Sequence, residues 1–436
     1  MARVSLSATA VIVVLVLATP AATSAKRAPS RDWAYALAIQ RDGKLVAAGR
    51  SVGGGWRFAV ARYTARGKLD PSFGQGGKAF TLVGSSGSAS ALAIQRDGKI
   101  VAAGQAYVGP EQDVAVVRYT SRGRLDASFG RRGTALTDFS PTTKTYDQAR
   151  ALAVQRDGKL LLAGGSMSFS LSSSRRLLIR YTARGRLDRS FGEDGTVSSR
   201  AGPSVGSGGV AIQRDGKIVT AGSVGDGFAV TRYTPRGRLD RSFGRGGTVS
   251  TKLASYSFGH ALAIQPDGKI VVVGDAALDF GIARYTAAGK LDRSFGDSGK
   301  VVTNIGLTKG SDGSRYPSDD HAVAVAIQRD GKLVVAGSSD VLGLLGEKGC
   351  CLQDFALVRY TEDGRLDPSF GNGGKVLTHF ARNSYAEGIV IQPDGKIVAA
   401  GGGDGYFLLA RYTSGGKLDP TFGRGGRVRT TLRPAA

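Results

Sequence analysis

The chain alternates short runs of apolar, β-prone residues with polar turns built around glycine. In the first copy of the pattern, apolar runs at 36–39 and 45–49 are joined by a turn containing Asp42-Gly43. Asp-Gly is a strong hairpin signal because glycine accepts the positive φ that the turn requires. Further extended runs follow at 58–63 and 77–81, and no stretch shows the 3.6-residue apolar period of a helix. The pattern therefore predicts a unit of four antiparallel strands.

This unit occurs seven times along the 436 residues. The turn aspartates of the copies follow one another at intervals of 52 to 64 residues; they are Asp42, Asp97, Asp157, Asp215, Asp267, Asp330 and Asp394. Seven four-stranded units suit a closed ring, which leaves no long strand edge exposed. We therefore predict an all-β fold, a single seven-bladed β-propeller of four-stranded antiparallel blades over residues 36–432. The repeats are expected near 36–81, 91–137, 150–198, 208–251, 260–304, 322–379 and 386–432.

The repeated letters resemble a known family. The pattern Ala38-Ile39-Gln40-x-Asp42-Gly43-Lys44, followed by Arg62-Tyr63 and Leu69-Asp70-x-Ser72-Phe73-Gly74, is similar to the delta-60 repeat of exported bacterial proteins. The resemblance covers about residues 36–432 and implies a propeller on a secreted or surface protein. It implies no reaction and no general ligand, so function has to be argued from a site.

Residues 1–25 predict a secretory signal peptide, because they contain the three parts that such a peptide has. Arg3 supplies a positive start, Ala8–Ala18 an apolar stretch too short to span a bilayer comfortably, and Thr23-Ser24-Ala25 a small-residue cleavage site. We expect cleavage after Ala25, a short lead at 26–35, and a secreted or cell-surface monomer with no transmembrane segment. An uncleaved anchor is the alternative.

The chain has two cysteines, Cys350 and Cys351, which are adjacent. A disulfide framework is excluded because it needs several separated pairs. A disulfide between the two neighbours, an intermolecular link and two free thiols all remain open.

The net charge of +24 is concentrated in the two constant turns of each copy, which we expect on one face of the ring. Such a face would attract an anionic cell-surface polymer, although turns that are simply solvated are the alternative. Sequence-specific nucleic-acid binding is not expected, because no aromatic residues interleave with the cations. The candidate polyanion-binding residues are Arg41, Lys44, Arg66, Arg96, Arg122, Arg156, Arg184, Arg214 and Arg236.

Residues present in every copy are expected to build the scaffold. An arginine before each tyrosine is followed eight residues later by an aspartate, a spacing that predicts a structural ion pair. The predicted pairs are Arg62 with Asp70, Arg118 with Asp126, Arg180 with Asp188, Arg232 with Asp240, Arg284 with Asp292, Arg359 with Asp367 and Arg411 with Asp419. Calcium ligation by these aspartates is the weaker alternative, since no Asp-x-Asp-x-Asp loop surrounds them. We predict no metal site and no cofactor.

The connections of variable length are expected on the opposite face, where long loops on a rigid scaffold tend to carry function. The two longest, 304–321 and 338–353, flank the first two strands of the sixth copy. The candidate ligand-binding residues are His260, Asp312, Tyr316, Asp319, Asp320 and His321. Carboxylates beside a histidine could ligate a metal or act as acid and base, while a solvated polar loop is the alternative.

The motifs assign no catalytic residue, so the predicted function is an exported binding module for an unknown protein or glycan. A hydrolase or lyase acting on a carbohydrate or lactone is one alternative. A cell-wall or polyanion adhesin that uses the basic face is the other.

Overall fold

The computed structural model describes residues 32–432 except 54, 140–144, 169–173, 201–206, 310–314, 341–352 and 381–382. Within these residues every regular element is a strand, from β1 to β30. The predicted all-β propeller of four-stranded antiparallel sheets is confirmed. The predicted signal segment and the cysteine pair lie outside the described residues, and the described part contains no helix long and apolar enough to cross a membrane.

Five of the sheets have four strands, each hydrogen-bonded to the next in chain order. The first contains β1 (Trp33–Ile39), β2 (Leu45–Val52), β3 (Trp56–Tyr63) and β4 (Lys78–Thr81). Another contains β13 (Ser207–Ile212), β14 (Ile218–Val224), β15 (Gly227–Tyr233) and β16 (Thr248–Thr251). The next contains β17 (Ser257–Ile264), β18 (Ile270–Ala276), β19 (Asp279–Tyr285) and β20 (Lys300–Thr303).

The last two four-stranded sheets continue this order. One contains β23 (Asp320–Ile327), β24 (Leu333–Ser339), β25 (Asp354–Tyr360) and β26 (Lys375–Thr378). The other contains β27 (Tyr385–Ile391), β28 (Ile397–Gly403), β29 (Tyr406–Tyr412) and β30 (Arg427–Thr430). A separate short hairpin is formed by β21 (Leu307–Lys309) and β22 (Arg315–Pro317).

One sheet has eight strands. It contains β5 (Ser86–Ile94), β6 (Ile100–Val108), β7 (Glu111–Tyr119), β8 (Thr134–Thr137), β9 (Thr145–Val154), β10 (Leu160–Ser168), β11 (Arg175–Tyr181) and β12 (Thr196–Arg200). A single residue pair, Gln112 with Tyr146, joins the strands β5–β8 to β9–β12.

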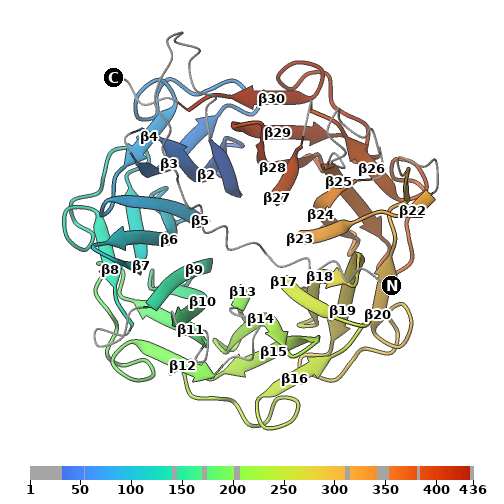
Figure 1. Cartoon of the computed structure of the whole chain (residues 1–436), viewed down its shortest axis with the longest axis horizontal. Helices are drawn as coiled ribbons and strands as arrows, with labels where there is room; N and C mark the ends of the chain where they lie inside the picture. The colour runs from blue at the N-terminus through green and yellow to red at the C-terminus, as the bar shows by residue number, and fades with distance from the viewer. Residues whose placement is uncertain are drawn as a thin grey trace, which may run out of the picture.

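The sheets are arranged around a central axis, with the first strand of each sheet nearest the centre (Figure 1). The last sheet packs against the first: Gly423 N donates to Arg66 O at 3.0 Å, and Tyr63 OH donates to Thr430 Oγ1 at 3.0 Å. Strand β30 pairs with β29, so the C-terminal strand completes the last sheet rather than crossing to the first.

The hydrophobic core lies between neighbouring sheets. Val46 and Val60 of the first sheet, for example, belong to one buried cluster with Ile100 and Val117 of the next. Because both faces of each sheet are buried, the sequences of β2 and β3 are mostly apolar instead of alternating between apolar and polar residues.

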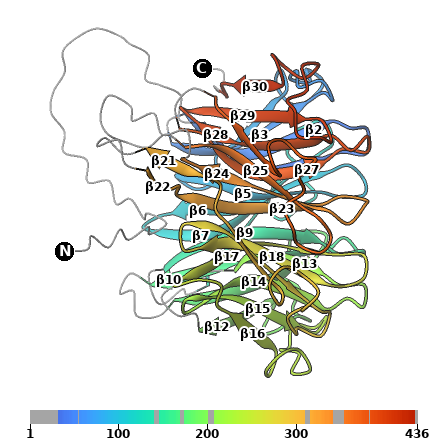
Figure 2. The same ribbon diagram turned by 90° about the vertical axis from the view of Figure 1, so that its right-hand side faces the viewer.

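The ring has two distinct faces. The turns after the first and third strands lie together, as the 3.3 Å contact between Lys44 Nζ and Asp70 Oδ2 indicates. We call this side the constant-turn face. The other side, here the variable face, carries the links between second and third strands and between sheets; Figure 2 shows the β21–β22 hairpin there.

Candidate functional site

Each first strand carries a β-bulge at the same place. The bulged residue has no partner in the register of the second strand; the seven are Tyr35, Ser90, Arg150, Gly208, His260, Val323 and Glu387. A bulge turns one side chain out of the regular alternation. In this ring the bulged strands are those nearest the axis (Figure 1).

A repeated glycine on the second strand makes the bulge sterically possible. A Cβ on Gly274 would lie 1.8 Å from the carbonyl oxygen of Phe258, and a Cβ on Gly337 would lie 1.7 Å from that of His321. No side chain can be accommodated at such a distance. The glycine of the repeated Ala-Gly and Val-Gly pairs is therefore explained by close backbone approach.

The bulged residues differ in all seven copies, although the letters around them repeat. Their neighbours on the second strand differ with them. Arg50 has its guanidinium carbon 5.6 Å from the ring centroid of Tyr35, whereas Asp275 Oδ2 lies 2.9 Å from His260 Nε2. The copies are therefore chemically distinct at the axis, on the half of each first strand nearer the variable face.

Two histidines meet on one carboxylate in this region. Asp275 Oδ2 lies 2.9 Å from His260 Nε2 and 3.3 Å from His321 Nδ1, while His321 Nε2 lies 3.4 Å from Asp319 Oδ1. Burial opposes ionisation of Asp275, but the two imidazoles outweigh it and hold its pKa below the ordinary value. Burial likewise opposes the charge on His321, yet the two carboxylates raise its pKa to about 10.

Glu387 adds a third carboxyl group from the next sheet. Burial raises its pKa to about 7, against the opposing effects of a hydrogen bond from Trp33 and the charges of His260 and His321. Trp33 Nε1 donates to Glu387 Oε1 at 3.3 Å, and the Trp33 ring lies 5.4 Å from that of Tyr385. We call His260, Asp275, Asp319, His321 and Glu387 the axial cluster.

The axial cluster can donate and accept hydrogen bonds and can exchange protons near neutral pH. With a pKa of about 7, Glu387 is present in both its acid and its base form at that pH. His321 stays protonated there because its pKa is about 10. The arrangement suits recognition of a ligand rich in hydroxyl or carbonyl groups, and it also meets the pKa requirement of a general acid or base.

The predicted ligand-binding residues are only partly brought together. His260, His321 and Asp319 belong to the axial cluster, whereas Asp320 does not. Asp320 is fully buried and accepts hydrogen bonds from Ile305 N at 2.7 Å and Ser339 Oγ at 2.5 Å. The proposed role of Asp320 in ligand binding is therefore corrected to a structural one.

Aspartates at the start of other first strands have the same structural role, each accepting a hydrogen bond from a backbone N–H that follows a fourth strand. Leu432 N donates to Asp32 at 2.6 Å, and Phe139 N donates to Asp147 at 2.9 Å. Asp312 and the side chain of Tyr316 lie outside the described residues.

The predicted arginine–aspartate pairs are in contact in the structure. Six arginines place Nε 2.8 to 2.9 Å from Oδ2 of the aspartate, and Arg411 places Nη2 3.0 Å from Asp419 Oδ2. The aspartate takes up only one of the arginine's nitrogens in this contact. Arg232, for instance, uses its other nitrogens for Ser242 Oγ and for the carbonyl of Ala287 in the adjacent sheet, at 3.2 and 2.6 Å.

Each of these arginines therefore links its own hairpin to the next sheet, and Arg411 donates to Ala65 O across the junction of last and first sheets. The guanidinium also lies over a buried ring, as for Arg62 over Phe73 at 4.8 Å. Burial opposes ionisation of Asp70, but hydrogen bonds from Ser72 and the charges of Arg62 and Lys44 lower its pKa to about 2.

The predicted polyanion-binding residues are divided between paired and exposed cations. Lys44 contacts Asp42 at 3.2 Å and Asp70 at 3.3 Å, so its charge is compensated locally. The arginines are exposed at both turns; they are Arg41, Arg66, Arg96, Arg122, Arg156, Arg184, Arg214 and Arg236. A cavity of about 650 Å³ on this face is lined in part by Gln40, Arg41, Gln328 and Arg329.

Sequence reasoning missed Asp275, Glu387 and Trp33. The available signal was the position five residues before the repeated glutamine, where otherwise matching copies carry unlike residues. Comparing the copies at that position would have indicated Glu387 beside His260. Asp275 and Trp33 also stand at positions where the copies carry unlike residues, directly after the second-strand glycine and two residues before the bulge. The comparison would not have shown which of these residues meet, since their partners lie on other strands.

Solved structures resemble the chain at low identity. A protein from Lactobacillus plantarum is 13% identical, with a TM-score of 0.45 over 89% of this chain and 94% of its own. Virginiamycin B lyase from Staphylococcus aureus is 10% identical, with a TM-score of 0.39 over 79% and 84%. Sqt1 from Chaetomium thermophilum, bound to the N-terminus of ribosomal protein L10, is 13% identical, with a TM-score of 0.45 over 91% and 87%. A search of curated proteins found no match.

One family model matches the sequence repeatedly. It is described as a domain of unknown function (DUF5122) beta-propeller, and it matches residues 40–73, 95–129, 155–191, 213–243, 265–295, 352–370 and 392–422. These segments comprise 218 of the 436 residues and recur once in each copy of the repeat. The chain therefore belongs to the family described as the DUF5122 beta-propeller.

Proposed function

We propose that the protein is an exported binding module whose ligand contacts the axial cluster at the variable-face end of the ring axis. The observation that supports this most is the convergence of His260 and His321 on Asp275, beside a Glu387 of raised pKa. Four sheets that are otherwise built alike contribute to the cluster and its Trp33 neighbour. Unlike residues at matched positions are what recognition of one ligand requires, because a repeated residue would give every sheet the same surface.

The ligand class that fits is a glycan or a polar protein segment. Carboxylate and imidazole groups recognise hydroxyl and amide groups through directional hydrogen bonds. The β21–β22 hairpin is proposed to frame the site, since Asp319 of the axial cluster follows β22 by two residues. Most of the loop 338–353 lies outside the described residues, so its part in the site stays a prediction.

The test is binding of the purified mature protein to a glycan array and to a panel of purified bacterial wall polysaccharides. We expect the double variant His260→Gln/Glu387→Gln to lose at least about tenfold in affinity for any glycan that the wild type binds. His379→Gln is the control, because His379 pairs with Asp354 near the outer strand of the β23–β26 sheet. Equal binding by the double variant and the control would place the ligand elsewhere.

A hydrolase or lyase acting on a carbohydrate or lactone is the second candidate. The pKa of about 7 for Glu387, beside two histidines, favours it, because a general acid or base works best near the operating pH. We expect a Glu387-dependent turnover of model lactones or nitrophenyl glycosides. Turnover that survives Glu387→Gln would rule out this assignment.

We further infer that the ring has seven blades and that the repeat is the delta-60 repeat. The eight-stranded sheet would count as two blades, since one residue pair joins its halves. The chain is proposed to be a bacterial monomer, secreted after cleavage behind Ala25. N-terminal sequencing of the exported protein tests the last point, and a sequence starting at Met1 would indicate an uncleaved anchor.

A further inference from the structure

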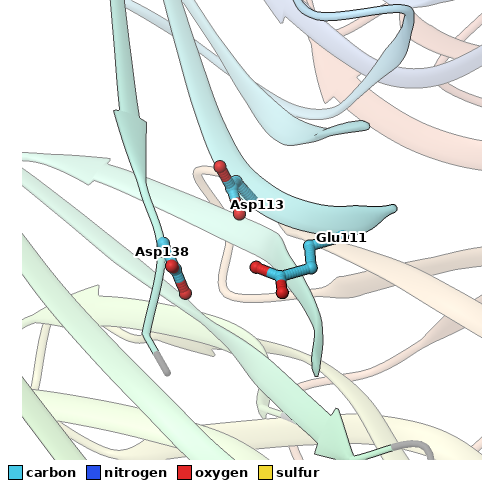
Figure 3. Close-up of side chains that lie close together, drawn as sticks. All are labelled: Glu111, Asp113 and Asp138. Atoms are coloured by element: carbon cyan, nitrogen blue, oxygen red, sulfur yellow. The ribbon is translucent and has the colours of Figure 1, made fainter. Parts of the chain in front are cut away.

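Three carboxylates gather at one place on the variable face, outside the axial cluster. Glu111 and Asp113 lie on β7, and Asp138 follows the end of β8 (Figure 3). One oxygen from each lies within 4.8 Å of the others. Asp113 is only 8% exposed, while Glu111 is half-buried and Asp138 is exposed.

The matched position in two other sheets also holds an aspartate, and its contacts there are those of a paired carboxylate. Asp279 on β19 accepts a hydrogen bond from Asn304 Nδ2 at 2.8 Å, and Asp354 on β25 lies 2.8 Å from His379 Nδ1. Both donors directly follow the threonine that ends the fourth strand. In the sheet of Asp113 this position is held by Asp138, a second acid.

Asp113 thus lies beside other carboxylates, whereas Asp279 and Asp354 each lie beside a side chain that donates a hydrogen bond. Its side chain accepts no hydrogen bond and forms no ion pair with any residue that the structure describes, although it points toward Glu111 and Asp138 (Figure 3). Burial, followed by the charges of Asp138, Asp147 and Glu111, raises the pKa of Asp113 to about 6. Glu111 and Asp138 thus add carboxylate oxygens beside a buried carboxylate, an arrangement that a bound cation would stabilise.

We propose that Glu111, Asp113 and Asp138 bind a hard divalent cation, with Ca²⁺ the best fit. Carboxylate oxygens are the ligands that Ca²⁺ and Mg²⁺ prefer, and Ca²⁺ accepts flexible, irregular coordination such as side chains from β7 and the end of β8 would give. Mg²⁺ demands a near-ideal octahedron. Water completes the coordination on the solvent side, where Asp138 is exposed.

The site differs from the arginine-paired aspartates, whose buried carboxylate contacts a guanidinium, because Asp113 contacts no cationic side chain among the described residues. It also does not depend on the axial cluster, so the proposal stands apart from the proposed function. With three carboxylates on an exposed rim, the affinity is expected in the range of extracellular modules, a Kd of about 10⁻⁴ to 10⁻³ M.

The experiment is thermal unfolding of the mature protein in EDTA and in about 10 mM CaCl₂, together with calorimetric titration of Ca²⁺. We expect Ca²⁺ to raise the Tm of the wild type by about 1–3 °C and Mg²⁺ to raise it less. The response should weaken as the pH falls, because carboxylates bind a metal ion in their deprotonated form.

Asp138→Asn is the decisive variant, because it reproduces the Asn304–Asp279 pair. We expect it to lose the Ca²⁺ response and to be at least as stable as the wild type in EDTA. Asp279→Asn is the matched control and should respond to Ca²⁺ like the wild type. A wild type that shows neither a Tm shift nor heat of binding with Ca²⁺, or an Asp138→Asn protein that responds equally, would overturn the proposal.

Discussion

Individual residues in this protein fall into two kinds, those that every copy repeats and those that one copy has alone. Arg284 is of the first kind: it contacts Asp292 at 2.8 Å and the carbonyl of Glu362 in the adjacent sheet at 2.5 Å. Asp275 is of the second kind, since no other copy has an aspartate at the matched second-strand position, which holds for example Arg50 or Ser338. The first kind stabilises the ring, and the second kind distinguishes one part of its axis from another.

Replacing Asp275 by Asn should return the pKa of His321 from about 10 toward its ordinary value of 6.5. The folded protein holds this proton more tightly than the unfolded chain does. The contribution of His321 to stability is therefore complete below pH 6.5 and is lost as the pH rises through 10. Histidine NMR titration and urea unfolding at pH 6, 8 and 10 measure both effects. A His321 that titrates near 6.5 in the wild type would contradict the assignment.

Replacing Arg284 by Met should destabilise the protein by about 3–5 kcal/mol, because it leaves Asp292 buried with one cationic partner fewer. Urea unfolding measures the loss. The control is Arg245→Met at an exposed turn, where a change within about 0.5 kcal/mol is expected. Equal effects of the two substitutions would mean that the buried pair contributes nothing specific.

At the scale of the element, the first strand combines a regular half with a bulged half. Its regular half leads into the Asp-Gly hairpin, where Gly43 adopts a φ of 80° and its N donates to Gln40 O at 2.9 Å. Its bulged half brings a side chain such as His260 or Glu387 to the axis. The bulge depends on the glycine opposite it, so one backbone position controls the orientation of a site residue.

Replacing Gly274 by Ala should therefore disturb the β17–β18 pair and separate His260 from Asp275. The added Cβ would lie 1.8 Å from Phe258 O, so the strands must shift, at a cost of about 1–3 kcal/mol or more. Denaturant unfolding and the NMR signal of His260 report the two effects. Gly415→Ala is the matched control, with its nearest atom 3.9 Å away; a loss of similar size there would refute the steric argument.

On the scale of the whole molecule, closure and face asymmetry follow from the arrangement of the sheets. The junction of last and first sheets uses contacts of the same kind as the others, including Arg411 to Ala65 O and Gly423 N to Arg66 O. The two faces differ because local turns fill one and long connections fill the other. The exposed arginines of the constant-turn face are the basis of the alternative prediction, a polyanion adhesin.

If that face binds polyanions, retention on heparin should fall steeply with added salt, because counterions are released on binding. The variant with Arg66, Arg122, Arg184 and Arg236 all changed to Gln should elute at lower salt than the wild type. The same four positions changed to Lys keep the charge and should elute with the wild type. Retention that does not respond to salt, or that survives the glutamine changes, would exclude this use of the face.

The sequence by itself determined the four-stranded unit, the turns and the repeated arginine–aspartate positions. These features depend on contacts within one hairpin, such as the bond from Asp70 N to Arg62 O at 2.9 Å, so a local pattern is enough to predict them. Only the tertiary structure decided which unlike residues meet. Trp33 and Glu387 are 354 positions apart, and His321 reaches Asp275 from another sheet, because curvature of the ring brings the first strands to one axis. Asp320 was misplaced for the same reason: its backbone partner, Ile305, becomes its neighbour only when the adjacent sheets pack.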